Sequence, residues 1–172
     1  MTRIRVVVTD YIEPDLKWEE EQFGELGVEF SYHQLKFSDP EQILNLTKEA
    51  DIVIVNMAKI NTEVIHGLQH CRLIIRHGVG YDNVDVVAAT QRNIVVSYVP
   101  DYCVEEVAEQ TLMLIFACQR KLLLQSRILY DSAEKQKWEF SPIYPVFRLN
   151  GKTLHHRFWP HRGSGLSDDE GV

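Results

Sequence analysis

The sequence lacks the run of about 18 consecutive apolar residues that a membrane helix requires. Met1-Thr2-Arg3 leads directly into a strand-like segment, and no basic-then-apolar signal peptide is recognisable there. Basic residues are also outnumbered: 18 Lys and Arg against 25 Asp and Glu leave a net charge of −7. Nucleic acid is therefore not expected as the main partner, because phosphate binding needs clustered cations. We expect a soluble, cytoplasmic protein.

Cysteine is scarce, with three residues and no Cys-x-x-Cys pair, so no zinc or thiol-redox motif is indicated. Cys118 lies in an apolar run and is predicted to be a small core residue. His66 and His70 lie four residues apart, which suits a metal pair, but no third ligand follows at useful spacing. No metal site is expected.

The 172 residues are 45% apolar, enough for the core of about one domain. Five short runs rich in Val and Ile predict buried strands: Ile4–Thr9, Val28–Gln34, Asp51–Asn56, Leu73–His77 and Ile94–Val99. The segments between them have helical spacing or capping signals: Asp15–Leu26, Asp39–Ala50, Thr62–Leu68 and Asn83–Gln91. This alternation predicts an α/β fold of flavodoxin-like type, a parallel five-stranded sheet with helices on both faces.

The longest predicted helix, Val104–Leu124, follows the last strand. Its apolar residues cover far more than one narrow stripe, so it needs partners on several sides. Such a helix suits a crossing between two domains or between two subunits. An irregular segment with several aromatic residues follows it.

The sharpest local feature is the loop Arg76–Asp85, between a predicted strand and a predicted helix. Gly78 and Gly80 let the backbone approach a ligand, and successive N–H groups in such a turn form an anion-binding concavity. A substrate-contacting loop is the favoured interpretation, and a plain structural turn is the alternative. A dinucleotide fingerprint is not indicated, because Asn83 stands where the third glycine of Gly-x-Gly-x-x-Gly belongs.

The polar residues around this loop leave alternatives open. His77 is either a general acid or a structural residue that orients another group. Tyr102 either reaches a ligand at the sheet edge or covers the sheet. Asp82 and Asn83 are predicted to cap the following helix.

One continuous string, residues 77–115, carries a stronger signal: HGVGYDNVDVVAATQRNIVVSYVPDYCVEEVAEQTLMLI. It resembles the N-terminal, substrate-binding part of the D-isomer-specific 2-hydroxyacid dehydrogenase family, which includes phosphoglycerate dehydrogenases and the C-terminal binding proteins. The resemblance extends from Ile4 to Leu154. It implies a substrate-binding domain over residues 1–101, and an interdomain helix with the start of an NAD domain over residues 102–154.

The resemblance also implies chemistry, namely hydride transfer between a nicotinamide and a 2-hydroxy or 2-oxo acid. The backbone of Gly78-Val79-Gly80 would bind the substrate carboxylate, with His77 and Tyr102 beside it. Val79 and Thr111 would lie near the NAD cofactor. The resemblance assigns no catalytic residue to this chain, because the family's catalytic Arg, His and Glu follow the glycine motif of the NAD domain.

After Leu154 the sequence departs from the family pattern. Relatives continue with a strand and Gly-x-Gly-x-x-Gly, whereas this sequence continues with HHRFWPHR. If the codons that can encode this segment are read in a frame shifted by one nucleotide, they can encode the expected glycine motif. We therefore expect that a frameshift at about Leu154 made residues 155–172 an out-of-frame, disordered tail, and that the truncated chain is inactive alone.

Two functions are consistent with these observations. The first is an NAD(P)-dependent oxidoreductase acting on a small 2-hydroxy acid, a homodimer in its full-length form. The alternative is a non-enzymatic interaction module of the C-terminal-binding-protein type.

Overall fold

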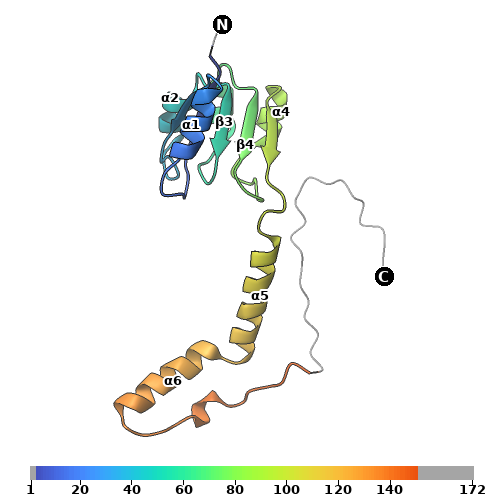
Figure 1. Cartoon of the computed structure of the whole chain (residues 1–172). Helices are drawn as coiled ribbons and strands as arrows, with labels where there is room; N and C mark the ends of the chain where they lie inside the picture. Colours follow the sequence, from blue (N-terminus) through green and yellow to red (C-terminus); the bar gives the residue numbers. More distant parts are fainter. Residues whose placement is uncertain (1–2, 151–172) are drawn as a thin grey trace, which may run out of the picture. The chain divides into compact units, whose positions relative to one another are not determined.

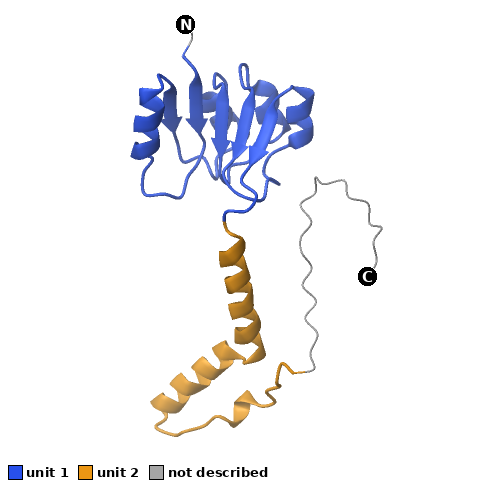
Figure 2. Cartoon of the chain, turned by 45° about the vertical axis from the view of Figure 1, so that its right-hand side comes forward, with its two compact units in different colours: residues 1–102 blue, residues 103–172 orange. Residues whose placement is uncertain are grey.

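The computed structural model describes residues 3–150, which divide into two compact units between Tyr102 and Cys103 (Figure 2). Residues 155–172, for which the sequence predicts an out-of-frame tail, lie outside the described residues. The frameshift and the tail therefore stay predictions.

The first unit is built on a five-stranded sheet (Figure 1). The strands are β1 (Arg5–Val8), β2 (Glu29–Tyr32), β3 (Ile52–Val55), β4 (Leu73–Arg76) and β5 (Val95–Tyr98). All neighbouring pairs are parallel, in the order β2-β1-β3-β4-β5. The predicted α/β fold and each of the five predicted strands are confirmed.

Four helices connect the strands: α1 (Lys17–Glu25), α2 (Pro40–Thr47), α3 (Thr62–Gly67) and α4 (Val86–Gln91). Helix α3 contacts α2 on one side and α4 on the other, so these three helices form one layer. The connection from β1 to β2 runs across the sheet in the opposite direction to the later ones. Since crossovers between parallel strands are right-handed, α1 lies on the other face.

The core lies between β3, β4 and the layer formed by α2, α3 and α4. Val53 and Val55 are 1% and 0% exposed, and Ile74 beside them is 0% exposed. They pack with Ile43 of α2 and Ile65 of α3 in one hydrophobic cluster. Each such side chain contributes about 1.5–3 kcal/mol by leaving water, so this layer fixes the positions of the strand ends.

Helix α4 begins later than the sequence predicts. Asp85 is its N-cap, and its carboxylate accepts the N–H of Ala88 at 3.0 Å. The prediction that Asp82 and Asn83 cap this helix is wrong, because the helix starts beyond them at Val86.

The second unit contains α5 (Val104–Gln119), α6 (Leu122–Glu134) and the short 3₁₀ helix η1 (Ser141–Ile143). The prediction of a single helix over Val104–Leu124 is therefore wrong at its end, because α5 ends at Gln119 and a second helix begins at Leu122. Lys121 adopts a left-handed conformation with φ of 54°, which ends α5, and its ammonium group donates to the carbonyl oxygen of Ile143 at 3.0 Å. A lysine gives no sequence signal for such a break, since glycine or asparagine is the usual residue there.

Cys118 is exposed on α5, which corrects the prediction of a core residue. Within residues 103–150 much of the apolar surface of α5 and α6 is exposed, including Leu114, Phe116 and Leu123. Among the helices in residues 3–150, none combines the length and the apolar character needed to cross a bilayer.

Candidate functional site

The carboxyl ends of the parallel strands meet at one edge of the sheet, where open α/β sheets bind their ligands. Here the segments that follow β1, β3, β4 and β5 surround a cavity of about 250 Å³. Its walls are formed by Ile12, Glu13, Asn56, His77, Val99 and Tyr102. The structure thus brings together two residues that the sequence singles out, His77 and Tyr102.

Asp10, at the end of β1, fixes the segment that follows β3. This residue is 2% exposed, and the Thr9 hydroxyl donates to its carboxylate at 2.9 Å. Three consecutive backbone N–H groups donate to the same carboxylate, from Asn56 (3.2 Å), Met57 (2.6 Å) and Ala58 (3.1 Å). These donors compensate the cost of burying the carboxylate. An acidic residue directly after an apolar strand was the available signal, and sequence reasoning missed it.

Asn83 joins the segment after β4 to the segment after β3. Its side-chain amide donates to the carbonyl oxygens of Asn56 at 3.3 Å and Ala58 at 2.9 Å. The backbone carbonyl oxygen of Asn83 accepts the N–H of Ile60 at 2.8 Å. The carbonyl oxygen of Ile60 in turn accepts the N–H of Asp85 at 2.9 Å. Asp10 and Asn83 therefore hold the same short segment from two sides, which makes this side of the cavity rigid.

The loop after β4 turns sharply at Gly78, where φ is +151°. The Gly78 N–H donates to the Arg76 carbonyl oxygen at 2.9 Å, and the Gly78 carbonyl oxygen accepts the N–H of Val99 at 3.1 Å. The Arg76 guanidinium lies over this turn and donates to the carbonyl oxygen of His77 at 2.7 Å. A Cβ at Gly78 would lie 1.5 Å from Arg76 Nη1, so a larger residue would displace the guanidinium.

The next two N–H groups of this loop, unlike that of Gly78, are available to a ligand. Within residues 3–150, the N–H groups of Val79 and Gly80 donate to no acceptor, and both residues are only half-buried. The loop is anchored further along, where the ring of Tyr81 packs against that of Tyr98 with centroids 5.3 Å apart. Two unused donors on a fixed turn at the end of a parallel strand suit a small anion.

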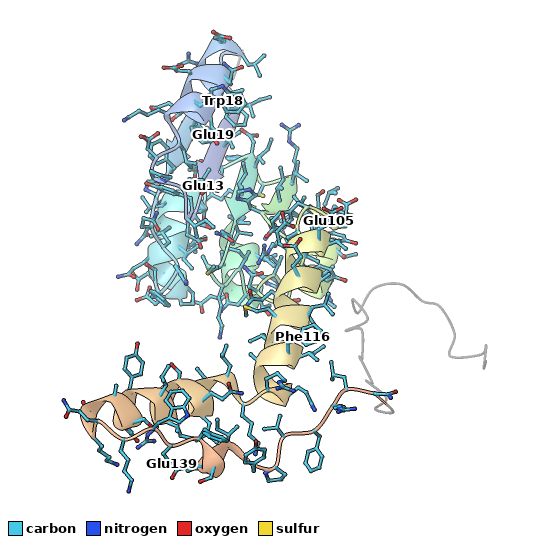
Figure 3. All side chains as sticks on the ribbon, turned by 60° about the horizontal axis from the view of Figure 1, so that its bottom comes forward. Glu13, Trp18, Glu19, Glu105, Phe116 and Glu139 are labelled. Carbon is cyan, nitrogen blue, oxygen red and sulfur yellow. The ribbon has the colours of Figure 1, made fainter. Side chains whose placement is uncertain are left out.

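Glu13 is a lining residue that sequence reasoning missed (Figure 3). It belongs to the segment between β1 and α1, and its carboxylate accepts the N–H of Ile12 at 2.9 Å. Its place in the cavity depends on how that segment folds against the loops after β3 and β5, which no local pattern reveals.

Thr111 lies in the second unit, on α5, where its hydroxyl donates to the Val107 carbonyl oxygen at 2.7 Å. His70 lies 3.4 Å from a carboxylate oxygen of Glu49. No group of three or more His, Cys, Asp or Glu in residues 3–150 is arranged to hold a metal ion.

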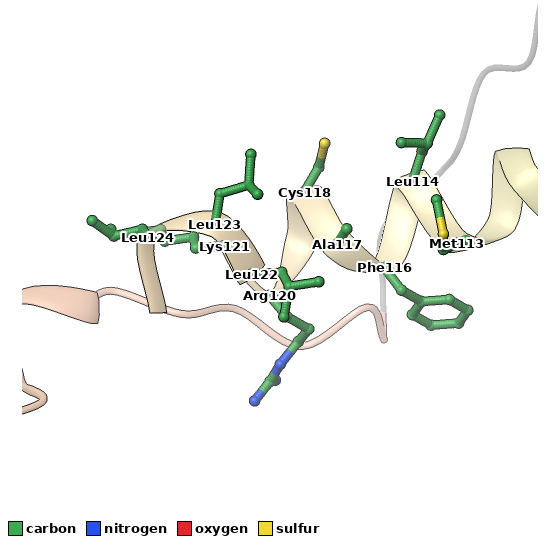
Figure 4. A pocket seen from close by; sticks show the side chains of 10 residues that line it. All are labelled: Met113, Leu114, Phe116, Ala117, Cys118, Arg120, Lys121, Leu122, Leu123 and Leu124. Atoms are coloured by element: carbon green, nitrogen blue, oxygen red, sulfur yellow. The ribbon is translucent and has the colours of Figure 1, made fainter. Parts of the chain in front are cut away.

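A larger cavity of about 810 Å³ lies in the second unit, along the end of α5 and the start of α6 (Figure 4). Its walls are mostly apolar side chains, such as Leu114, Phe116 and Leu122. The Cys118 thiol lines it as well, but among the described lining residues no His, Asp or Glu accompanies this thiol as a base. The cavity at the sheet edge is therefore the better candidate for chemistry.

Residues 6–164 match the family model for the D-isomer specific 2-hydroxyacid dehydrogenase catalytic domain. This match covers most of the chain. The chain belongs to this family.

Individual relatives agree with that assignment. D-3-phosphoglycerate dehydrogenase of Methanocaldococcus jannaschii is 31% identical over 152 residues, covering 88% of this chain and 27% of that protein. Hydroxypyruvate reductase of Thermotoga maritima is 30% identical over 117 residues, covering 67% of this chain and 37% of that protein. The solved NAD⁺-bound 3-phosphoglycerate dehydrogenase of Entamoeba histolytica is 30% identical, with a TM-score of 0.61, covering 70% of this chain and 40% of that one. The chain spans less than half the length of each of these relatives.

Proposed function

We propose that this chain supplies the substrate-binding unit of an NAD(P)-dependent D-2-hydroxyacid dehydrogenase, over residues 1–101. Residues 102–154 would form the interdomain helix and the start of the NAD domain. The whole protein would transfer a hydride between a nicotinamide and the C2 carbon of a 2-hydroxy or 2-oxo acid. The observation that carries the proposal is the pair of unused N–H groups at Val79 and Gly80, in the loop that begins with the cavity-lining residue His77.

In this proposal the N–H groups of Val79 and Gly80 bind the substrate carboxylate. Backbone donors on a fixed turn are already oriented, so binding costs little conformational entropy. His77 and Tyr102 line the cavity next to this loop and would contact the rest of the acid. Asp10 and Asn83 act as positioning residues, since they hold the opposite wall through the backbone of residues 56–58.

The described residues do not by themselves fit the diphosphate of a dinucleotide. At the position of a third glycine, Asn83 uses its side chain to bond two carbonyl groups, and α4 does not begin until Val86. The proposed contacts of this chain with the cofactor are therefore limited to Val79 and Thr111. The nicotinamide, when bound by the whole protein, supplies or accepts the hydride.

The carboxylate site is testable on the full 172-residue chain. With ¹⁵N-labelled protein, D-lactate is expected to shift the amide signals of Val79 and Gly80 in a saturable manner. D-lactamide is the matched probe, because it keeps the shape and loses the charge, and it should shift these signals far less. Equal effects of the two probes, or none from lactate, would refute the proposed carboxylate site.

The activity needs the whole protein. NADH oxidation with 2-oxo acids by a full-length form would support the dehydrogenase. Tight binding of a partner peptide at the sheet or its grooves, with no turnover of any 2-oxo acid, would support the interaction module instead.

The proposal includes a cytoplasmic location and a homodimer for the full-length form. The exposed apolar side chains of α5 and α6, Leu114 and Phe116 among them, support association of subunits. Light scattering after size-exclusion chromatography of the full-length form tests the proposed homodimer. A monomer at micromolar concentration would contradict the proposed homodimer.

A further inference from the structure

The wall of the cavity at the sheet edge includes a carboxylate, that of Glu13, which forms no ion pair with any other described residue. Glu13 is half-buried in its wall and accepts one N–H, from Ile12, at its Oε2 oxygen. Across residues 3–150, no Lys, Arg or His side chain lies within ion-pair distance of it. The charge of Glu13 therefore acts on whatever enters the cavity.

The other described lining residues offer little that would offset this charge for an anionic group. Ile12, Val99 and the ring of Tyr102 are apolar surfaces, and Asn56 contributes a neutral amide. Of the lining residues within 3–150, His77 alone can carry a positive charge, and none is Lys or Arg. Phosphate sites normally use Arg or Lys, because a phosphate monoester carries about −1.5 to −2 charges at pH 7.

The position of the cavity relative to the proposed carboxylate site decides which part of a ligand meets Glu13. His77 precedes Val79 by two residues, so their Cα atoms are at most about 7.6 Å apart. The lining residue His77 thus links the loop of the Val79 and Gly80 N–H groups to the cavity, and in the proposed site the C3 substituent of a bound three-carbon acid enters the cavity. Glu13 would then act on the C3 substituent.

We propose that Glu13 is a specificity-determining residue of this site. It favours 2-hydroxy or 2-oxo acids whose C3 substituent is uncharged and donates a hydrogen bond, such as a hydroxyl group. It disfavours acids that carry a phosphate or a second carboxylate there. This inference rests on the proposed function, since it takes the loop after β4 as the carboxylate site.

A comparison of two acids on the full chain tests the proposal. D-glycerate and D-3-phosphoglycerate differ only in the phosphate at C3, and their dissociation constants can be measured by amide-shift titration at constant ionic strength. We expect D-glycerate to bind at least tenfold more tightly. In Glu13→Gln the amide oxygen can still accept the Ile12 N–H, and the preference is expected to shrink at least fivefold.

Glu25→Gln is the matched control, because it removes the same charge at the far end of α1, at an exposed position outside the cavity. It is expected to leave the preference unchanged. Equal affinity of the two acids for the unmodified chain would overturn the role of Glu13, as would an unchanged preference in Glu13→Gln. If the chain binds neither acid, the proposed function itself is refuted, and the inference is refuted with it.

Discussion

The Oδ2 oxygen of Asp10 lies 2.6 Å from the backbone nitrogen of Met57, which ties the end of β1 to the segment after β3. Oδ1 of the same carboxylate accepts the N–H groups on either side, from Asn56 and Ala58. One buried side chain thus organises three residues that are more than 45 positions away in the sequence. Because Asn56 lines the candidate site, this contact also positions part of its wall.

Replacement of Asp10 by Ala should destabilise the first unit. It leaves three N–H groups without their acceptor, and a buried donor without a partner costs about 1–3 kcal/mol. Because Met57 is partly exposed, water can replace part of the loss, and we expect about 2–4 kcal/mol in the free energy of unfolding by urea. Asp101→Ala, at an exposed position after β5, is the control and should be close to neutral.

Replacement of Asn83 by Ala tests the second contact that holds the segment after β3, the one made by the Asn83 amide. The carbonyl oxygens of Asn56 and Ala58 would lose a donor, for an expected loss of about 1–2 kcal/mol. Asn83→Asp should be worse than Asn83→Ala, since a carboxylate would then face two carbonyl oxygens. Thermal unfolding followed by circular dichroism gives the order of the three proteins, and equal stability of the Asp and Asn forms would contradict the contact.

Much of the fold of the first unit was predictable because its local patterns agree with its packing. Runs such as Ile52–Val55 are apolar on both faces, which is required of a strand covered on both sides. The cap of α4 was misassigned because Asp82, Asn83 and Asp85 are all good capping residues within four positions. Only the contact of Asn83 with the neighbouring loop decides among them.

The candidate site was harder to predict than the fold. The loop at Gly78 was recognisable because two glycines follow a strand. His77 directly precedes it, and Tyr102 follows the next strand. Glu13 gives no comparable signal, because an acidic residue before a proline is common in surface loops of proteins. Its role depends on which loops meet at the edge of the sheet.

Gly78→Ala should disturb the site more than Gly80→Ala. At Gly78 the φ of +151° disfavours any residue with a Cβ, and that Cβ would displace the Arg76 guanidinium from the His77 carbonyl oxygen. We expect about 1–3 kcal/mol of destabilisation from the backbone alone. At Gly80 the nearest atom is 3.9 Å away, so alanine fits. Similar melting temperatures for the two variants would argue against this geometry.

The three cysteines should react with iodoacetamide at different rates. Burial raises the pKa of the Cys71 thiol to about 11, so at pH 8 about one molecule in a thousand carries the reactive thiolate. Cys118 is exposed on α5. Mass spectrometry of the timed reaction should find Cys118 modified first and Cys71 last in the native chain, with the difference abolished in urea. Rapid native labelling of Cys71 would show that this part of the sheet opens readily.

Asp85 should make stability depend on pH in the acid range. The Ala88 N–H and the Thr62 hydroxyl both donate to its ionised carboxylate, which lowers the pKa of Asp85 in the folded chain. Its contribution is therefore complete above the unfolded pKa of about 4 and is lost as the pH falls through the lower folded value. Asp85→Asn keeps an oxygen that can cap α4 and removes the titration, so its stability should fall less between pH 5 and pH 2.5. Asp82→Asn removes a charge from the same loop at a residue that caps nothing, and it should keep the pH dependence of the unmodified chain. If Asp85→Asn also keeps that dependence, the cap does not contribute to it.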